Sequence, residues 1–186
     1  LVQIGLIRSF GTSVLVNYVS DASGPHGGAV LTDDEVVYLS RVVELATAAA
    51  SRGETPFAAL LVAGGRVLAE SCNQTVHESN PTAHAEMVAI RVACSSLGTD
   101  SLIGATAFCS CEPCAMCLMA FYYAGVKKVV FAATIDDARD NGSGDPPIGS
   151  KWLAEQGELG IEIVAGPLQQ QAADLLNRYR ASFGHL

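Results

Sequence analysis

The chain has 186 residues, of which 49% are hydrophobic and 16% are charged, and this length and composition suit one domain with a well-buried core. Its net charge of −8 disfavours a nucleic-acid partner, because a folded RNA is normally bound by a basic face that neutralises phosphates. The six cysteines form no evenly spaced disulfide framework, and there is no secretory signal and no apolar run long enough to cross a membrane. These features predict a cytoplasmic protein without a membrane partner.

Residues 1–31 are expected to form an N-terminal extension that is either flexible or not native to the protein. This segment lacks a starting Met, shows no clean helix or strand period, and ends in a glycine-rich stretch at 23–28. The folded domain is therefore predicted over residues 32–186.

A helix is predicted to begin at Thr32, because Thr32 is a candidate N-cap and Glu35 occupies the reciprocal position of a capping box. This helix is expected to end near Arg52. The Gly64-Gly65 pair is a strong signal for a hairpin between two strands. These strands are predicted at 57–63 and 66–72.

The rest of the chain alternates between helical and strand periodicity. The remaining predicted elements are a helix over 84–97, a strand over 105–110, a helix over 114–123, a strand over 128–132, a short helix over 148–155, a strand over 161–165 and a helix over 167–183. A β-hairpin followed by β-α-β alternation predicts an α/β fold, a three-layer α/β/α sandwich around a mixed five-stranded sheet.

The chemistry is concentrated in His84-x-Glu86, which is followed later by Pro113-Cys114-x-x-Cys117. Imidazole and thiolate are good zinc ligands, and two cysteines three residues apart at the start of a helix can place both sulfurs on one ion. Three protein ligands leave a fourth position for water, as in a catalytic site. Glu86 is not needed as a ligand and is placed to accept a proton from that water. The pattern predicts one Zn²⁺ per chain, bound by His84, Cys114 and Cys117, with Glu86 as acid and base.

Other interpretations of the cysteines stay open at this point. C-x-x-C also occurs in structural zinc sites and in redox pairs. Cys109 and Cys111 would share one face of a strand and could complete a structural site with four cysteines, although His84 would then have no role. A zinc-binding interaction module would also hold the metal, but its function would survive the loss of the Glu86 carboxylate.

The paired pattern is that of zinc nucleobase deaminases, and the chain resembles the cytidine deaminase-like superfamily, most closely its guanine deaminase branch. The resemblance extends from about Asp33 to the C-terminus. It is carried by Pro56-Phe57, Asn73, Asn80-Pro81-Thr82-Ala83-His84-Ala85-Glu86 and Ser110-Cys111-Glu112-Pro113-Cys114-Ala115-Met116-Cys117-Leu118. It implies the cytidine deaminase-like fold and a homodimer, in which the subunits can exchange their C-terminal segments.

The resemblance also implies which residues bind the base. Asn73 is expected to hydrogen-bond the base, with Tyr123 packed against it and Phe57 on the opposite side of the pocket. Ala85 is a further expected contact with the substrate.

Residues late in the chain complete the implied site. An acidic residue that assists proton transfer or grips the amine edge of the base maps to Asp145, with Asp140 as the second candidate. His185 or Tyr179 is expected to cover the active site of its own subunit or of a partner. Glu112 is expected to support the cysteine turn through hydrogen bonds to the backbone.

The implied reaction is the hydrolytic deamination of free guanine to xanthine, with release of ammonia. Ala58 and Met119 depart from glycines common in the family and lie close enough to the expected pocket to reshape it. Other aminated rings, such as ammeline, cytosine or a cytosine analogue, are therefore alternatives, because hydroxide can attack the amine-bearing carbon of each. A tRNA adenosine deaminase shares the same patterns and is a further alternative, which the net charge of −8 disfavours.

Overall fold

A computed structural model of the protein describes residues 2–9, 12–19, 31–184 and 186. Strands β1 (Val2–Ser9) and β2 (Thr12–Val19) pair antiparallel in a sheet of their own. Both strands fall inside the predicted N-terminal extension 1–31. The division of the chain between that extension and a domain at 32–186 stays a prediction.

The main sheet has five strands: β3 (Ala58–Ala63), β4 (Arg66–Cys72), β5 (Ala105–Cys111), β6 (Lys128–Ala133) and β7 (Glu162–Ala165). Their order across the sheet is β4-β3-β5-β6-β7. β3 runs antiparallel to β4 and β5, whereas β6 and β7 continue parallel to β5. The predicted mixed five-stranded sheet is therefore confirmed.

The turn between β3 and β4 confirms the predicted hairpin. Gly64 and Gly65 have φ angles of 55° and 75°, in the left-handed region that residues with a Cβ atom avoid. Two successive left-handed residues give a turn whose twist matches that of antiparallel strands. The Gly-Gly pair is thus well suited to both positions of this turn.

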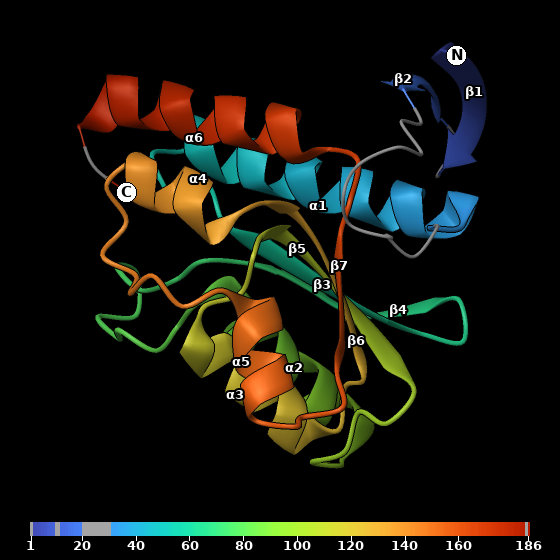
Figure 1. The fold of residues 1–186 in the computed structure, drawn as a ribbon, viewed down its shortest axis with the longest axis vertical. Coiled ribbons are helices and arrows are strands. Elements are labelled where there is room, and N and C mark those ends of the chain that lie inside the picture. The colour runs from blue at the N-terminus through green and yellow to red at the C-terminus, as the bar shows by residue number, and fades with distance from the viewer. Residues whose placement is uncertain (1, 10–11, 20–30, 185) are drawn as a thin grey trace.

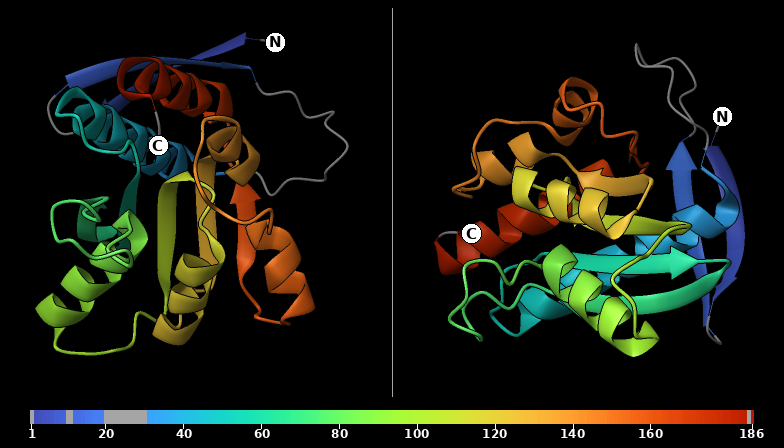
Figure 2. Two further views of the ribbon diagram at one scale, coloured as in Figure 1. Left: turned by 90° about the vertical axis from the view of Figure 1, so that its left-hand side faces the viewer. Right: turned by 90° about the horizontal axis from the view of Figure 1, so that it is seen from below.

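Helices cover both faces of the main sheet (Figures 1 and 2). They are α1 (Asp33–Ser51), α2 (Ala85–Leu97), α3 (Ala115–Ala124), α4 (Ile135–Asp140), α5 (Ser150–Gln156) and α6 (Gln169–Phe183). α1 and α6 pack on one face, and α2, α3 and α5 pack on the other. The predicted three-layer α/β/α sandwich is confirmed. No helix in the described part of the chain combines the length and apolar character needed to cross a bilayer.

Two apolar cores lie on either side of the sheet, because successive strand residues point to opposite faces. Leu60 packs into the α1-side core, which includes Leu39 and Leu176. Its neighbour Leu61 packs into the α2-side core, which includes Leu118 and Phe121. Both cores are closed to solvent, so the sheet is a rigid platform for the loops and helix starts at its edge.

Two helix starts show the same capping arrangement. Thr32 Oγ1 accepts a hydrogen bond from the backbone N of Glu35 over 3.2 Å, and Glu35 Oε2 accepts one from the backbone N of Thr32 over 2.9 Å. This confirms the capping box predicted for α1. α4 begins with an equivalent pair, Thr134 and Asp137, and was not among the predicted elements. Its six residues are too few to show a helical period in the sequence.

Candidate metal centre

The predicted metal donors lie at the starts of α2 and α3. His84 is the N-cap residue of α2, Cys114 is the N-cap residue of α3, and Cys117 lies in the first turn of α3. Neither N-cap side chain forms a capping hydrogen bond with its own helix. Because α2 and α3 pack side by side in the α2-side core, donors 30 residues or more apart in the sequence are brought together.

The three donor atoms form a triangle with nearly equal sides. Sγ of Cys114 lies 3.6 Å from Sγ of Cys117, and each sulfur lies 3.7 Å from Nδ1 of His84. A tetrahedral zinc ion with Zn–S bonds of about 2.3 Å and Zn–N bonds of about 2.0 Å requires edges of roughly 3.5 to 3.8 Å. The donor set is therefore compatible with one zinc ion per chain, and it leaves one corner of the tetrahedron for a fourth ligand.

Hydrogen bonds and burial shift the pKa values of the three donor side chains in different directions. The hydrogen bond between the sulfurs of Cys114 and Cys117 lowers the pKa of the Cys114 thiol to about 4. The same hydrogen bond, together with burial, raises the pKa of the Cys117 thiol. The contact with Cys114 also raises the pKa of His84. Such a cluster can exchange its protons for a cation, which is how metal binding couples to protonation.

Glu86 lies beside the donor triangle. It is in the first turn of α2, is only 7% exposed, and accepts a hydrogen bond through Oε2 from Sγ of Cys117 over 3.4 Å. Burial raises the pKa of Glu86 to about 7. A carboxyl group that titrates near neutral pH can both accept and donate a proton, as general acid–base catalysis requires.

The alternative with four cysteines does not fit the geometry. Cys109 packs into the α2-side core, whereas Cys111 packs into the α1-side core and donates to the backbone oxygen of Thr134 over 3.4 Å. Burial raises the pKa of both thiols well above its ordinary value, which favours their neutral form. In the part of the chain that the structure describes, the clustered donor set is His84, Cys114 and Cys117.

Asn73 follows β4 and is held in a defined orientation. Its Nδ2 donates to Oγ1 of Thr55 over 2.7 Å and to Oγ1 of Thr75 over 2.8 Å. Both hydrogens of the side-chain amide are thus engaged, and Oδ1 has no hydrogen-bond partner among residues 31–184. Asn73 therefore offers an acceptor. The resemblance implied a role for Asn73 but none for the two threonines, which look like ordinary loop residues in the sequence.

Residues 31–133 match the protein family described as the cytidine and deoxycytidylate deaminase zinc-binding region. This match spans more than half of the chain and includes His84, Glu86, Cys114 and Cys117. The chain belongs to this deaminase family. The resemblance predicted from the sequence is confirmed, and so is the fold that it implied.

Relatives of this deaminase act on different substrates. The chain is 43% identical to a guanine deaminase of Bacillus subtilis over 109 residues, which cover 58% of this chain and 70% of the relative. It is 35% identical to a tRNA-specific adenosine deaminase of the same bacterium over 149 residues, which cover 80% of this chain and 89% of the relative. A solved structure of a guanine deaminase from Nitrosomonas europaea matches with a TM-score of 0.73 and 30% identity, covering 83% of this chain and 88% of that one. These relatives support hydrolytic deamination of a nucleobase by the protein.

The other predicted base contacts of the deaminase differ in their surroundings. Ala85 is fully buried between His84 and Glu86, and its backbone oxygen accepts a hydrogen bond from Ser71 Oγ. Phe57 is half-buried and packs on the α1-side core. Tyr123 is 77% exposed on α3, where its ring lies 5.6 Å from that of Tyr122. The structure therefore brings Ala85 to the donor triangle and leaves Tyr123 at the surface of this single chain.

The predicted site residues late in the chain also differ in their burial and in their contacts. Asp145 is half-buried in the loop between α4 and α5, close enough that its charge adds to the effect of Cys114 on the pKa of His84. Asp140, the second candidate, is exposed at the end of α4. Tyr179 is buried and donates to the backbone oxygen of Gly53 over 3.1 Å, so it anchors α6 to its own chain. His185 lies outside the described residues.

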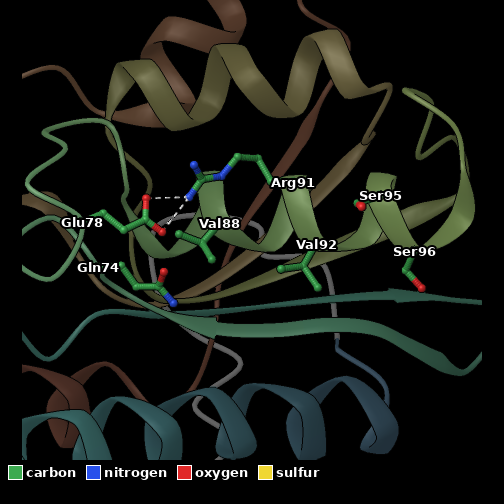
Figure 3. A pocket seen from close by; sticks show the side chains of 7 residues that line it. All are labelled: Gln74, Glu78, Val88, Arg91, Val92, Ser95 and Ser96. Carbon is green, nitrogen blue, oxygen red and sulfur yellow. Dashed lines mark hydrogen bonds and ion pairs between the residues drawn. The ribbon is translucent and has the colours of Figure 1, made fainter.

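An open pocket of about 490 Å³ lies on α2 and the loop that precedes it (Figure 3). Its lining residues are Gln74, Glu78, Val88, Arg91, Val92, Ser95 and Ser96. Arg91 is paired with Glu78 over 3.2 Å, so the charges in this pocket neutralise each other. None of the metal donors lines the pocket, and it is separate from the candidate metal centre.

Proposed function

We propose that this protein is a zinc-dependent deaminase of a free nucleobase, which converts guanine to xanthine and ammonia. The observation that carries the proposal is the donor triangle of His84, Cys114 and Cys117 with the buried carboxylate of Glu86 beside it. The triangle supplies three ligands of a zinc ion, and Glu86 supplies the group that moves protons. This division of roles is that of the nucleobase deaminases.

In the proposed reaction, His84, Cys114 and Cys117 would hold a zinc ion, which would supply the nucleophile by lowering the pKa of a water molecule toward neutrality. Glu86 accepts a proton from this water, and the water oxygen forms a bond with the ring carbon that carries the amine. Glu86 then donates the proton to the adjacent ring nitrogen. Glu86, with help from Asp145, then transfers the remaining proton from the added hydroxyl group to the amine, so that the carbon–nitrogen bond breaks, the carbonyl group forms and ammonia leaves.

Base recognition is assigned to Asn73, with Ala85, Phe57, Tyr123 and His185 as further contacts. The Asn73 amide presents Oδ1, which can accept from the ring N–H and amine groups of guanine. Ammeline and cytosine also carry an amine on an amidine carbon, so they are the alternative substrates. A free base is favoured over tRNA because a net charge of −8 repels a polyphosphate partner.

The test is ammonia release by the purified, zinc-loaded protein from guanine, ammeline, cytosine, cytidine, guanosine and a tRNA, with Glu86→Gln as the matched variant. Guanine is expected to be the best substrate. Glu86→Gln is expected to lower kcat by at least about 100-fold, the usual contribution of general acid–base catalysis, while zinc stays at one ion per chain. The substituted glutamine would keep the shape of the side chain and lose its ability to accept a proton.

Two outcomes would overturn the proposal in different ways. If tRNA alone releases ammonia, the reaction class stands and the substrate is wrong, as the tRNA-specific relative would then indicate. If Glu86→Gln retains full turnover with zinc bound, Glu86 has no part in proton transfer, and the metal centre has another role.

We also propose a cytoplasmic homodimer. Tyr122, Tyr123 and Trp152 are exposed on α3 and α5 by 39%, 77% and 58%, and a second copy of the chain would cover such an apolar surface. All six cysteines are free thiols, including the pair at the metal centre, which suits a reducing compartment. Sedimentation velocity of the zinc-loaded protein tests the dimer, and a single species with the monomer mass at micromolar concentration would contradict it.

A further inference from the structure

Three hydrogen bonds converge on the side chain of Glu112, which follows β5 and precedes Cys114 by two residues. Oε2 accepts from the backbone N of Ile135 over 3.1 Å. Oε1 accepts from the backbone N of Ser150 over 2.6 Å and from its hydroxyl over 2.7 Å. Ile135 and Ser150 are the first residues of α4 and α5. Glu112 therefore joins the metal-binding turn to the starts of two later helices.

The chain between α4 and α5 carries Asp145. Both ends of this connection are buried, since Asn141 is 5% exposed and Ser150 is 1% exposed. Asn141 is also fixed through its Nδ2, which donates to the backbone oxygen of Asp137 over 2.9 Å. The Asp145 carboxylate itself has no hydrogen-bond partner within the described residues. Its position is therefore set by the backbone of residues 141–149 and by whatever holds the two ends of that segment.

We propose that Glu112 is a positioning residue for deamination. It holds the loop that carries Asp145 at a fixed position relative to the metal-binding turn. Both of its oxygens accept hydrogen bonds from α4 and α5, so in this proposal the side chain acts through the segment that carries Asp145 and does not contact the substrate itself. Glu112 is also tied to β6, because its backbone N donates to the oxygen of Ala133 over 2.7 Å. The inference rests on the proposed function, in which Asp145 assists proton transfer.

A carboxylate is the group that this position requires. The donors are two backbone N–H groups and one hydroxyl, and they approach both oxygens of the side chain. Glutamine has the same shape, but its Nε2 would face a backbone N–H, and two donors cannot bond to each other. Glu112→Gln should therefore release the start of one helix while it preserves the volume of the side chain.

The experiment compares Glu112→Gln with Ser150→Ala, which removes one of the three hydrogen bonds, and with Glu155→Gln as the control on the exposed face of α5. Zinc content, kcat and KM for guanine are measured for each zinc-loaded protein. We expect Glu112→Gln to lower kcat by about 10- to 100-fold, as a catalytic group displaced by about 1 Å does. Ser150→Ala should give a smaller loss, Glu155→Gln none, and all three should retain one zinc ion per chain.

A double-mutant cycle with Asp145→Asn separates positioning from general structural damage. If Glu112 acts through Asp145, then Glu112→Gln should lower kcat by less than about 2-fold in the Asp145→Asn background, because the two losses are not additive. If the two losses multiply, or if Glu112→Gln loses zinc, the proposal is wrong and Glu112 serves the fold or the metal-binding turn.

Hydrogen exchange keeps this test distinct from that of the proposed function. In Glu112→Gln, amides of residues 141–149 should exchange about 10-fold faster, while those of α2 and α3 are unchanged. Unchanged exchange in residues 141–149 would overturn the role of Glu112 whatever the substrate proves to be. Faster exchange with no turnover of any base by the wild-type protein would instead retain the structural link and reject the substrate.

Discussion

Two helices on one face of the sheet begin differently from two helices on the other face. α1 and α4, which pack into the α1-side core, each begin with a capping box, Thr32 with Glu35 and Thr134 with Asp137. α2 and α3, on the other face, begin with His84 and Cys114, and neither side chain caps its helix. An N-cap without a side-chain acceptor typically destabilises a helix by about 1 kcal/mol.

On the face of α2 and α3, two N-cap positions thus lack the stabilising side-chain hydrogen bond and carry metal donors instead. An N-cap side chain points toward the free N–H groups of its helix, the place where an anion or a metal ligand can be held. His84 and Cys114 use that position for an imidazole and a thiolate that face each other. The starts of α1 and α4 therefore contribute stability, whereas the starts of α2 and α3 assemble a site.

The largest expected effect comes from Cys114→Ser, which removes one donor of the triangle. A hydroxyl is a much weaker zinc ligand than a thiolate, so zinc content should fall well below one ion per chain and turnover should fall by at least about 1,000-fold. Metal analysis after dialysis, together with ammonia release, measures both. Retention of full zinc content by Cys114→Ser would contradict the assigned donor set. Cys94→Ser, at a half-buried cysteine away from the triangle, is the control.

Serine at position 114 weakens zinc binding, but it should stabilise the metal-free protein relative to alanine at the same position. Serine is a good N-cap, whereas alanine is a poor one, so Cys114→Ser should be more stable than Cys114→Ala by about 1 kcal/mol in the presence of a chelator. Urea unfolding of the two variants measures the difference. If the two variants unfold at the same urea concentration, the stability of the start of α3 does not depend on its N-cap side chain.

Thr32→Ala removes the N-cap side chain of α1, which has no part in metal binding or in the proposed deamination. Loss of the hydrogen bond from the Glu35 backbone should reduce the free energy of unfolding by about 1 kcal/mol, with kcat unchanged. Thr32→Ser should restore most of the stability, because serine presents the same hydroxyl. A change of kcat in Thr32→Ala at a temperature where the protein is fully folded would show that the two faces are coupled.

The sequence allowed the prediction of the metal donors because their chemistry restricts both residue type and spacing. Cys114 and Cys117 are separated by one helical turn, and few residues other than cysteine and histidine bind zinc in this way. The strands of the hairpin were equally predictable, since the Gly64-Gly65 turn is a local requirement. The two threonines at Asn73 were not, because loop hydroxyls carry no periodic signal and only the folded chain shows what they contact.

The position of the loop that carries Asp145 could not be predicted from the sequence. Its placement depends on Glu112, whose partners Ile135 and Ser150 are 23 and 38 residues away in the sequence. It also depends on α4, a helix of six residues whose start is marked only by Thr134 and Asp137. Contacts over such separations leave no local pattern, so the loop could be assigned a role but not a position.

The smallest expected effect concerns the charge of Glu35, which serves the α1 cap and also pairs with Lys128, Oε1 lying 2.7 Å from Nζ. Partial burial acts to raise the pKa of Glu35, but hydrogen bonds from Lys128 and from the Thr32 backbone outweigh it, so the pKa lies below its ordinary value of 4.5. A carboxyl group whose pKa is lower in the folded state stabilises the fold above its ordinary pKa, and this contribution is lost as the pH falls through the folded-state value.

Glu35→Gln tests that charge while it keeps the cap, because glutamine also occupies this position in capping boxes. At pH 7 the variant should be less stable by roughly 0.5 to 1 kcal/mol, as for an ion pair near the surface. The loss should stay small because Lys128 keeps a second carboxylate, that of Glu162, at 3.9 Å. Urea unfolding of both proteins from pH 7 to pH 3 should show the difference shrinking below pH 4.5. A difference that persists undiminished at pH 3 would mean that glutamine weakens the cap itself, and the start of α1 would then depend on the shape of Glu35 more than on its charge.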